Sequence, residues 1–566
     1  WSGRILVPFC IESAFFGVMQ ALKPEQKLWY HRIIDIPAAW SGQQIMLHCD
    51  AIDWESDVYL DGKAIDRHRG GYDRFSINLT QLVKAGASHH LVIAVTDPTD
   101  SSWNMRGKQT LHPGGASYTA CSGIWQTVWL EPVPLAAVDS LHIVGDHTGR
   151  LTVTVDARTP PDPMPVTLHV LDGEKEVARA DGVLGAELVG GIKENFTWYK
   201  VIRTWVTTTL NLTIPAVKAW SPSDPFLYDL VIELKDKSGT VVDRVTSHVG
   251  MRTVAVAKDE LGNMRFHLNG RPLMLPGALD QGFWPDGVYT ASTDAALKYD
   301  IEAAKQLGLV AIRKHFKVEP ERYYSWADKL GLLVLQDLPS GGEGDPFTDE
   351  PRNHEAAAVC EMEKRRLIQQ RWNHPSIIGW AMFNEGWGQY DTLRHAAWAK
   401  QLDPSRLIDE ASGFPRHGGG DLHDVHGGNP PKEATRIGID SETLGVGLKV
   451  SGHMWPGKLW GTGSYDPNTG GMKEGWDPTE MDDAAKRWHT RLCADFYRGM
   501  WAGMDDTGTS GDFKVQLYDL ETEANGMLTY DRQVWKVDPA VVKRACSGVV
   551  TALTTTDLVP CSLTRQ

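Results

Sequence analysis

Apolar residues recur at every second position in short stretches of the first part of the chain. Residues 45–49 follow this period, which is typical of a half-buried β-strand. Residues 58–60 lead into Asp61-Gly62, a pair that favours a hairpin turn because Gly adopts positive φ without steric cost. These signals predict an all-β module over residues 1–134.

The last strand of this module is predicted at residues 122–131, where both faces are apolar. Trp125 and Trp129 share one face, and Ile124 and Leu130 share the other. A strand that is apolar on both faces is expected between two covering layers.

Short strands and turns continue over residues 135–256, with no long helical pattern. This texture over more than 100 residues predicts an immunoglobulin-like β-sandwich. The predicted strands lie at residues 141–144, 151–155, 166–170 and 227–234.

The pattern changes after residue 257, where apolar runs alternate with amphipathic helices. Such a repeat over about 310 residues predicts a (β/α)8 TIM barrel over residues 257–566. Residues 414–420 contain a proline and three glycines, so no regular helix is expected there. The clearest strands are expected at 273–275, 309–312, 332–335 and 377–383, and the clearest helices at 294–307, 319–330 and 355–372.

Composition narrows the functional classes. The chain has 566 residues and a formal net charge of −15, so its field repels nucleic acids and anionic membranes. No apolar stretch reaches the length of a membrane-spanning helix. Its 22 tryptophans outnumber 15 tyrosines and 14 phenylalanines, and indole rings suit flat ligands such as sugars. Core packing is the simpler explanation for most of them.

The chain begins at Trp1, not Met, and carries three Asn-X-Ser/Thr sequons, at Asn78, Asn195 and Asn211. We therefore expect a processed or truncated start and a secreted or extracytoplasmic glycoprotein, with a cytoplasmic location as the alternative. Seven widely spaced cysteines without a Cys-X-X-Cys pair favour neither a zinc site nor a dense disulfide scaffold.

Polar residues follow the predicted barrel strands, where TIM barrels carry their reactive groups. They come after the first strand (Asp280, Trp284), the second (Arg313, His315), the third (Asp337), the fourth (Asn384, Glu385, Trp387), the fifth (Ser412), the sixth (His426), the seventh (Glu442, Trp455) and the eighth (Tyr518).

Two of these residues, Glu385 and Glu442, are glutamates on opposite sides of the predicted barrel mouth. Hydrolysis of a glycosidic bond needs one protonated and one ionised carboxyl group, which such a pair can supply. The alternative is that each is an idle, solvated glutamate at the barrel rim.

The segment Trp-Ala-Met-Phe-Asn-Glu-Gly-Trp at residues 380–387 resembles the acid/base motif of glycoside hydrolase family 2, which includes β-galactosidases, β-glucuronidases and β-mannosidases. The resemblance covers nearly the whole chain and implies a sugar-binding jelly roll, an immunoglobulin-like domain and a barrel. It is carried by residues 7–13, 70–73, 97–100 and 122–131 in the first, 220–222, 225–228 and 250–252 in the second, and 280–286, 313–315 and 336–337 in the third.

The resemblance implies that Glu385 is the general acid/base, Asn384 binds the sugar 2-hydroxyl and Glu442 is the nucleophile. Thr443 departs from the pattern, because the family has Phe or Tyr there. Glu410 is the competing nucleophile, although it precedes the sixth strand.

The resemblance therefore implies a retaining exo-glycosidase, in which the carboxyl groups of Glu385 and Glu442 lie about 5 to 5.5 Å apart. We expect apolar tryptophans and ionised Glu442 to raise the pKa of Glu385. The Asn-X-Lys-Gly motif of the family's β-glucuronidases is absent, which favours a β-galactoside first, then an arabinofuranoside, galactofuranoside or mannoside. The rivals are a catalytically silent carbohydrate-binding or structural protein and a transglycosylase.

The remaining candidates have two interpretations each. Nine residues at the strand ends are expected to contact the sugar, but core packing or an ion-pair lattice would also explain their presence. Arg313 is also expected to orient Glu442. We expect a carbohydrate as the binding partner and no metal or other cofactor. The sequence is compatible with an oligomer. The nine expected sugar-contacting residues are Asp280, Trp284, Arg313, His315, Asp337, Trp387, His426, Trp455 and Tyr518.

Overall fold

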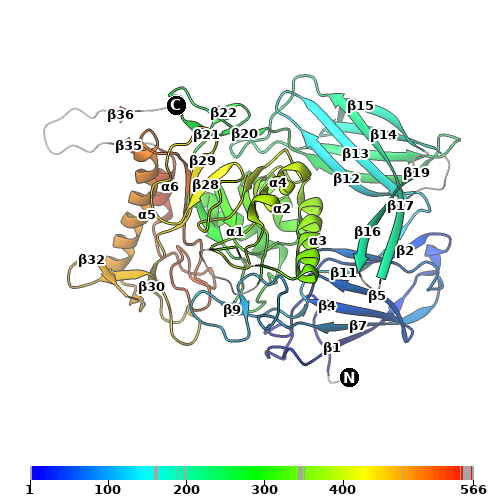
Figure 1. Ribbon diagram of the computed structural model, residues 1–566, viewed down its shortest axis with the longest axis horizontal. Coiled ribbons are helices and arrows are strands. Elements are labelled where there is room, and N and C mark those ends of the chain that lie inside the picture. The colour runs from blue at the N-terminus through cyan, green and yellow to red at the C-terminus, as the bar shows by residue number, and fades with distance from the viewer. Residues whose placement is uncertain are drawn as a thin grey trace.

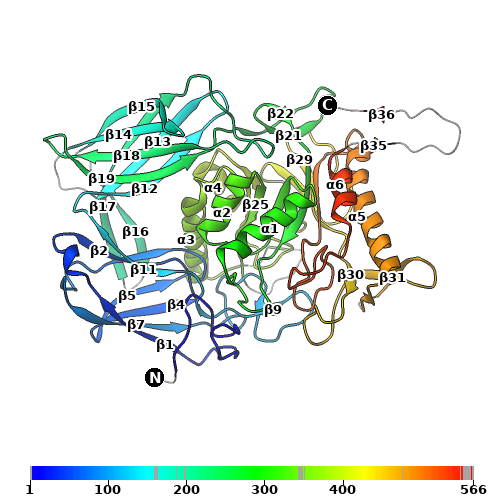
Figure 2. The ribbon, with the colours of Figure 1, turned by 180° about the vertical axis from the view of Figure 1, so that it is seen from behind.

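The computed structural model has three domains in chain order. Both β domains lie on one side of the barrel, and helices α5 (Asp483–Gly503) and α6 (Pro539–Cys546) lie on the other (Figures 1 and 2). The structure describes residues 3–158, 163–185, 188–196, 199–341, 348–349, 351–475, 477–548, 550–551 and 562–563.

The first domain is built of antiparallel sheets around a core that includes Leu47, Val58 and Ile93. Asp61 and Gly62 both have positive φ, which confirms the predicted hairpin turn. The antiparallel sheets are β1 (Leu28–Asp35), β7 (Ser88–Thr96), β4 (Glu55–Leu60) and β5 (Lys63–Arg69); β11 (Val128–Val133), β2 (Gln44–Cys49) and β6 (Phe75–Asn78); and β10 (Gly123–Ile124) and β3 (Ile52–Asp53). The short strands β8 (Gln109–Thr110) and β9 (Tyr118–Thr119) pair in parallel, and Ala38–Trp40 form a 3-10 turn.

The strand expected at residues 122–131 is interrupted between β10 and β11, and its two tryptophans differ. Trp125 is buried and donates its indole N–H to the Gly71 carbonyl over 2.8 Å. Trp129 is 37% exposed and stacks on His48. The prediction of a fully sandwiched strand is therefore wrong, because an imidazole covers the outer indole where a second layer was expected.

The second domain is the predicted sandwich, with two four-stranded sheets that bury Val153, Leu168 and Ile232 between them. The sheets are β12 (Ala137–Gly145), β13 (Arg150–Arg158), β17 (Tyr199–Thr213) and β16 (Leu188–Phe196); and β15 (Lys175–Leu184), β14 (Met164–Asp172), β18 (Tyr228–Lys235) and β19 (Val241–Val249).

A small antiparallel sheet leads into the barrel and packs against the N-terminal ends of its strands. It consists of β20 (Val254–Lys258), β21 (Met264–Leu268) and β22 (Arg271–Pro272). Phe266 of β21 shares one apolar cluster with Leu275, Ala311 and Leu333, each the first residue of a barrel strand. The opposite, C-terminal end of the barrel is therefore the end at which a site can open.

The third domain is a nearly closed parallel barrel. In spatial order its strands are β27 (Leu407–Asp409), β26 (Ile377–Ala381), β25 (Leu333–Asp337), β24 (Ala311–Lys314), β23 (Leu275–Asp280), β34 (Thr509–Lys514), β29 (Ile437–Thr443) and β28 (Leu422–Val425). Four further strands form an insertion after β29, and two more pair near the end of the chain: β30 (Val446–Lys449), β31 (Gly463–Asp466), β32 (Gly471–Glu474), β33 (Thr479–Glu480), β35 (Val550–Thr551) and β36 (Ser562–Leu563).

The barrel helices confirm the predicted periodicity to within a few residues. Besides α5 and α6 they are α1 (Asp294–Gln306), α2 (Glu321–Leu330), α3 (His354–Arg371) and α4 (Thr392–Leu402). The side chains of Thr293 and Asn353 accept backbone N–H groups and so begin α1 and α3, while Gly331 ends α2 at a φ of 71°. Residues 410–421, between β27 and β28, contain no helix, which confirms the prediction for residues 414–420.

The first domain contacts the barrel at α3 and at the barrel mouth. Glu363 of α3 accepts the backbone N–H groups of Gly71 and Tyr72 at 2.8 and 3.1 Å. Beyond β7, the backbone N–H groups of Arg106 and Gly107 donate to the carbonyl of Ser340, which follows β25. This segment therefore brings side chains of the first domain to the C-terminal end of the barrel.

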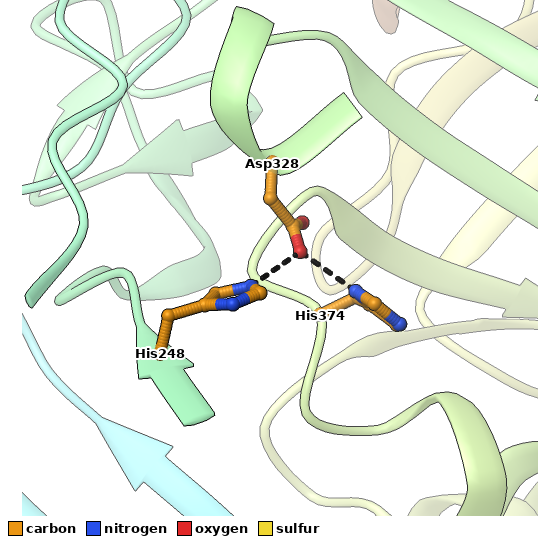
Figure 3. A group of neighbouring side chains, drawn as sticks. All are labelled: His248, Asp328 and His374. Atoms are coloured by element: carbon orange, nitrogen blue, oxygen red, sulfur yellow. Dashed lines mark hydrogen bonds and ion pairs between the residues drawn. The ribbon is translucent and has the colours of Figure 1, made fainter. Parts of the chain in front are cut away.

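The second domain contacts the barrel through a histidine network. His374 donates from Nδ1 to Asp328 over 2.6 Å and from Nε2 to Glu321 over 2.7 Å, while His248 of β19 lies 3.0 Å from Asp328 (Figure 3). Burial alone would lower the pKa of His374, but the carboxylates of Asp328 and Glu321 raise it to about 9. His374 is therefore an imidazolium bridge within the barrel, and His248 extends the network to the sandwich.

We predict that His374→Gln lowers the free energy of unfolding by about 3 kcal/mol near pH 6, because the buried carboxylate of Asp328 loses the imidazolium 2.6 Å away. The raised pKa means that this contribution is fully present below the ordinary value of 6.5 and is lost as pH rises through about 9. Urea denaturation at pH 6 and pH 10 measures it. The exposed control His112→Gln should differ little from wild type at both values, and a His374→Gln effect of equal size at both would contradict the prediction.

Candidate active site

Glu385 and Glu442 lie at the C-terminal ends of two barrel strands. Glu385 follows β26 in a tight turn, with a φ of 48° that few non-glycine residues adopt, and its N–H donates to the Ser412 carbonyl over 3.1 Å. Glu442 is the penultimate residue of β29. Strained backbone of this kind is common where a side chain must be aimed at a ligand.

The two carboxylates converge. A carboxylate oxygen of Glu385, one of Glu442 and a ring nitrogen of His426 all lie within 4.8 Å of one another. The side chains of Glu385 and Glu442 are 24% and 18% exposed, so a ligand can reach both. The spacing agrees with the close carboxyl pair expected from the sequence.

The buried guanidinium of Arg313 holds several of these groups in position. It binds both oxygens of Asp337 at 3.1 and 2.9 Å and donates to Glu442 over 3.2 Å. It also donates to the side-chain oxygen of Asn384 over 2.7 Å, which fixes the orientation of that amide. The predicted contact between Arg313 and Glu442 is present.

His426 lies between the two glutamates. Its Nδ1 is 2.5 Å from Glu385 Oε1 and 3.9 Å from Glu442 Oε2, while its Nε2 is 2.9 Å from Ser412 Oγ. Burial would lower the pKa of His426, but the negative charge of Glu442 and the hydrogen bond to Glu385 raise it.

The electrostatics contradict the expectation for Glu385. Burial would raise its pKa, but the hydrogen bond and charge of His426 lower it to about 2. The predicted rise is therefore wrong, because the nearest neighbour of the carboxylate is an imidazolium and not an apolar indole. Burial and Glu385 act to raise the pKa of Glu442, yet His426 and Lys108 bring it below its ordinary value.

Asp280, Tyr518 and His315 are engaged within the barrel. Asp280 accepts from Lys314 Nζ and Gly282 N at 2.9 and 2.8 Å, and from the Tyr518 hydroxyl. His315 Nδ1 is 2.7 Å from Asp337, and its Nε2 has no hydrogen-bond partner among the described residues. Asp280 and Tyr518 thus belong to an ion-pair lattice, while His315 keeps one ring nitrogen available.

The three candidate tryptophans have different surroundings. Trp284 is buried, and the Arg532 guanidinium lies 4.0 Å from its ring centroid, so that face is covered. Trp387 is half-buried, with Lys108 Nζ 5.8 Å from its ring. Trp455 is half-buried and packs edge-on against Tyr530. Of the three, Trp387 lies nearest to Glu385 in the chain.

The competing nucleophile, Glu410, has a different task. It is buried and accepts the backbone N–H groups of His417, Gly418 and Gly419 at 2.7 to 3.0 Å. These bonds fix the helix-free loop that follows β27, so Glu410 is not available as a nucleophile.

Lys108 and Glu523 are site residues that the sequence patterns did not reveal. Lys108 comes from the first domain and is buried, and its charge acts to lower the pKa values of Glu385, Glu442 and Glu523. Glu523 lies after β34 and accepts from Gln516 over 2.9 Å. Only the contact between two domains brings Lys108 here, so no local pattern could identify it.

In the described part of the chain, two clusters each bring together three side chains that could bind a metal. The first is His248, Asp328 and His374, and the second is Glu385, His426 and Glu442. In each group the raised pKa of one histidine, His374 or His426, favours a protonated ring that donates hydrogen bonds to carboxylates. Both groups are therefore best described as ion-pair networks. No helix among the described residues has the length and apolar character needed to span a membrane.

Three family models match successive parts of the chain. They are the sugar binding domain of glycosyl hydrolases family 2 at residues 8–134, glycosyl hydrolases family 2 at residues 137–252, and the TIM barrel domain of the same family at residues 260–418. Glu385 lies inside the last range and Glu442 lies beyond it.

Curated relatives include a putative β-glucuronidase of Formosa agariphila, 27% identical over 445 residues, which are 77% of this chain and 47% of that protein. A β-galactosidase of Thermoanaerobacter pseudethanolicus is 24% identical over 385 residues, which are 67% of this chain and 47% of that protein. The chain thus spans about half the length of these relatives.

Solved structures share the fold. A β-galacturonidase from Eisenbergiella tayi bound to glycerol has a TM-score of 0.71 at 18% identity, covering 99% of this chain and 95% of that one. β-Glucuronidase 2 of Bacteroides uniformis has a TM-score of 0.68 at 18% identity, covering 94% of this chain and 64% of that one.

We predict that Arg313→Met lowers the free energy of unfolding by about 3 to 5 kcal/mol, because buried Asp337 loses its cation. Adding Asp337→Asn should restore part of this loss. The control Arg322→Met, at an exposed arginine 3.3 Å from Asp294, should change stability by less than about 1 kcal/mol. Urea denaturation of the four proteins measures these effects, and equal midpoints for the two arginine variants would contradict the prediction.

Proposed function

The chain belongs to glycosyl hydrolase family 2, and from that premise we propose that it is a retaining exo-glycosidase that removes a terminal sugar from a carbohydrate. The observation that carries the proposal is the approach of Glu385 and Glu442 to within 4.8 Å, oxygen to oxygen. An inverting enzyme holds its carboxyl groups about 6.5 to 9.5 Å apart to admit a water molecule between them. The observed pair favours direct attack on the sugar.

In the first step Glu442 attacks the anomeric carbon and forms a covalent glycosyl-enzyme, while the leaving oxygen receives a proton by way of Glu385. The lowered pKa of Glu442 keeps the nucleophile ionised, and Arg313 fixes its orientation. In the second step ionised Glu385 activates the water that releases the sugar.

Asn384 is suited to bind the sugar 2-hydroxyl beside this pair. Because its oxygen accepts from Arg313, its amide N–H₂ is left free to face Glu385 and lies 3.3 Å from Glu385 Oε2. A donor in this place can gain strength as charge develops at the anomeric centre, which is how 2-hydroxyl contacts assist glycoside cleavage.

A β-galactoside is our first proposed substrate, since the Asn-X-Lys-Gly motif is absent. A β-hexuronide is the second, because relatives are named β-glucuronidases and Lys108 brings a cation to the site. Nitrophenyl β-galactoside, β-glucuronide, β-galacturonide, β-mannoside, α-arabinofuranoside and β-galactofuranoside compare these classes directly.

We also propose an extracytoplasmic glycoprotein. The exposed side chains of Asn78 and Asn211 support modification at two of the three sequons. The third, at Asn195, includes residues outside the described part of the chain.

We predict that Glu442→Gln lowers kcat at least about 10⁴-fold, because the amide is not a nucleophile. Glu385→Ala should spare dinitrophenyl glycosides, whose leaving group needs no proton, and azide should restore turnover by replacing the activated water. Steady-state kinetics on dinitrophenyl and alkyl glycosides measure both effects. A near-native rate for Glu442→Gln would exclude this assignment.

A mechanism-based 2-deoxy-2-fluoro glycoside separates the proposal from its rivals. It should label wild-type Glu442 stoichiometrically, as read by mass spectrometry of the peptide, and should leave Glu442→Gln unlabelled. A silent binding protein would not be labelled, and a transglycosylase would be labelled but would transfer the sugar to an added alcohol in preference to water.

A further inference from the structure

His426 is the residue that contacts both proposed catalytic carboxylates. Its Nδ1 approaches Glu385 Oε1 at 2.5 Å and Glu442 Oε2 at 3.9 Å. Its side chain is only 7% exposed, so water scarcely screens these charges. A buried imidazole between two carboxylates is strongly favoured in its protonated form.

The charged groups around His426 reinforce this preference. Negative groups predominate, and the neighbouring imidazole has a pKa held well below its usual range by burial, so it is neutral. The titratable groups that act on His426, or on which it acts, are Glu385 after β26, Asp424 of β28, Asp440 and Glu442 of β29, Asp337 of β25 and His315 directly after β24.

The other ring nitrogen is held by a chain of hydroxyl groups. His426 Nε2 lies 2.9 Å from Ser412 Oγ, which lies 2.6 Å from Ser441 Oγ, which in turn accepts from Arg313 over 3.3 Å. Nε2 can therefore donate to Ser412 whether or not Nδ1 carries a proton. A proton can move between Nδ1 and Glu385 Oε1 without rearrangement of the ring.

We propose that His426 is a positioning residue that stores the proton delivered by Glu385, so that the resting site holds an imidazolium and two carboxylates in place of a protonated glutamic acid. The proposal deepens the proposed function and rests on it. It assigns the acid to a shared Glu385–His426 pair that carries one proton.

The first step is balanced in charge and atoms. The proton on His426 Nδ1 passes to Glu385 and then to the glycosidic oxygen as the bond from that oxygen to the anomeric carbon breaks. The electron pair of Glu442 forms the new bond to the same carbon. The aglycone leaves as a neutral alcohol, and the site then holds ionised Glu385, neutral His426 and a neutral glycosyl ester at Glu442.

The second step restores the resting site. Glu385 takes a proton from water as the water oxygen bonds to the anomeric carbon and the ester bond to Glu442 breaks. That proton passes to His426 Nδ1, and Glu442 regains its negative charge. The net charge of the three groups is −1 before and after each step.

The charge state of His426 is tested first, without turnover. In protein carrying ¹⁵N-labelled histidine, a spectrum at pH 7 should show His426, assigned by its absence in His426→Gln, as an imidazolium with both ring nitrogens protonated. In Glu385→Gln the same ring should lose its proton at a lower pH than in wild type. A neutral His426 at pH 7 in wild type would overturn the inference, even if the enzyme hydrolyses glycosides as proposed.

Kinetics test the stored proton. His426→Gln should lower kcat/KM for an alkyl glycoside about 10²-fold and that for a dinitrophenyl glycoside less than about threefold, because only the former needs an acid. The basic limb of its pH profile should move to lower pH by about one unit or more, since Glu385 then holds the proton alone.

His423→Gln is the matched control. His423 lies on β28, three residues before His426, but binds Glu433 over 2.5 Å, so its variant should keep the wild-type profile. Equal losses on both glycosides in His426→Gln with an unchanged basic limb would reveal a merely structural role and overturn the inference. Wild-type protein that cleaves no glycoside, yet shows the imidazolium, would refute the proposed function instead.

Discussion

The architecture of the candidate active site depends on one buried guanidinium. Arg313 on β24 binds Asp337 on β25, Asn384 after β26 and Glu442 on β29, so one side chain couples the ends of four strands. Asn384 directly precedes Glu385, and holding the amide also restricts the turn from which that glutamate projects. A planar cation with five donors suits this task, because it can satisfy three partners in fixed directions.

Charge balance is the second constraint. The barrel mouth gathers several carboxylates in a poorly solvated space, where like charges raise one another's pKa values. His426 and Lys108 offset that repulsion, one from the barrel and one from the first domain. The first domain thus contributes to the electrostatics of a site whose glutamates it does not supply, which is a physical reason for the domains to remain in contact.

The sequence was sufficient for the fold because each domain has its own hydrophobic period. Alternation predicted the β domains, and apolar runs between amphipathic helices predicted the barrel. The proline and glycines of residues 414–420 predicted the missing helix there. Strand ends and the family resemblance predicted that Glu385 and Glu442 would converge. The predicted burial of Trp129 was wrong, because among the described residues only His48 stacks on its ring and the face is otherwise open.

The remaining misses concern contacts between distant segments. Lys108 reaches the barrel mouth only through the packing of the first domain, and the low pKa of Glu385 arises from a histidine 41 residues away in the chain. Neither contact has a local period or motif, and pKa values follow from three-dimensional neighbours.

The stereochemistry of the first-formed sugar tests the pairing of Glu385 and Glu442 on one anomeric centre. Proton NMR of the anomeric signals during rapid hydrolysis of a β-glycoside reports it before mutarotation intervenes. Double displacement predicts that the β-anomer appears first and the α-anomer only later. An α-anomer that appears first would mean single displacement by water and would contradict the covalent mechanism.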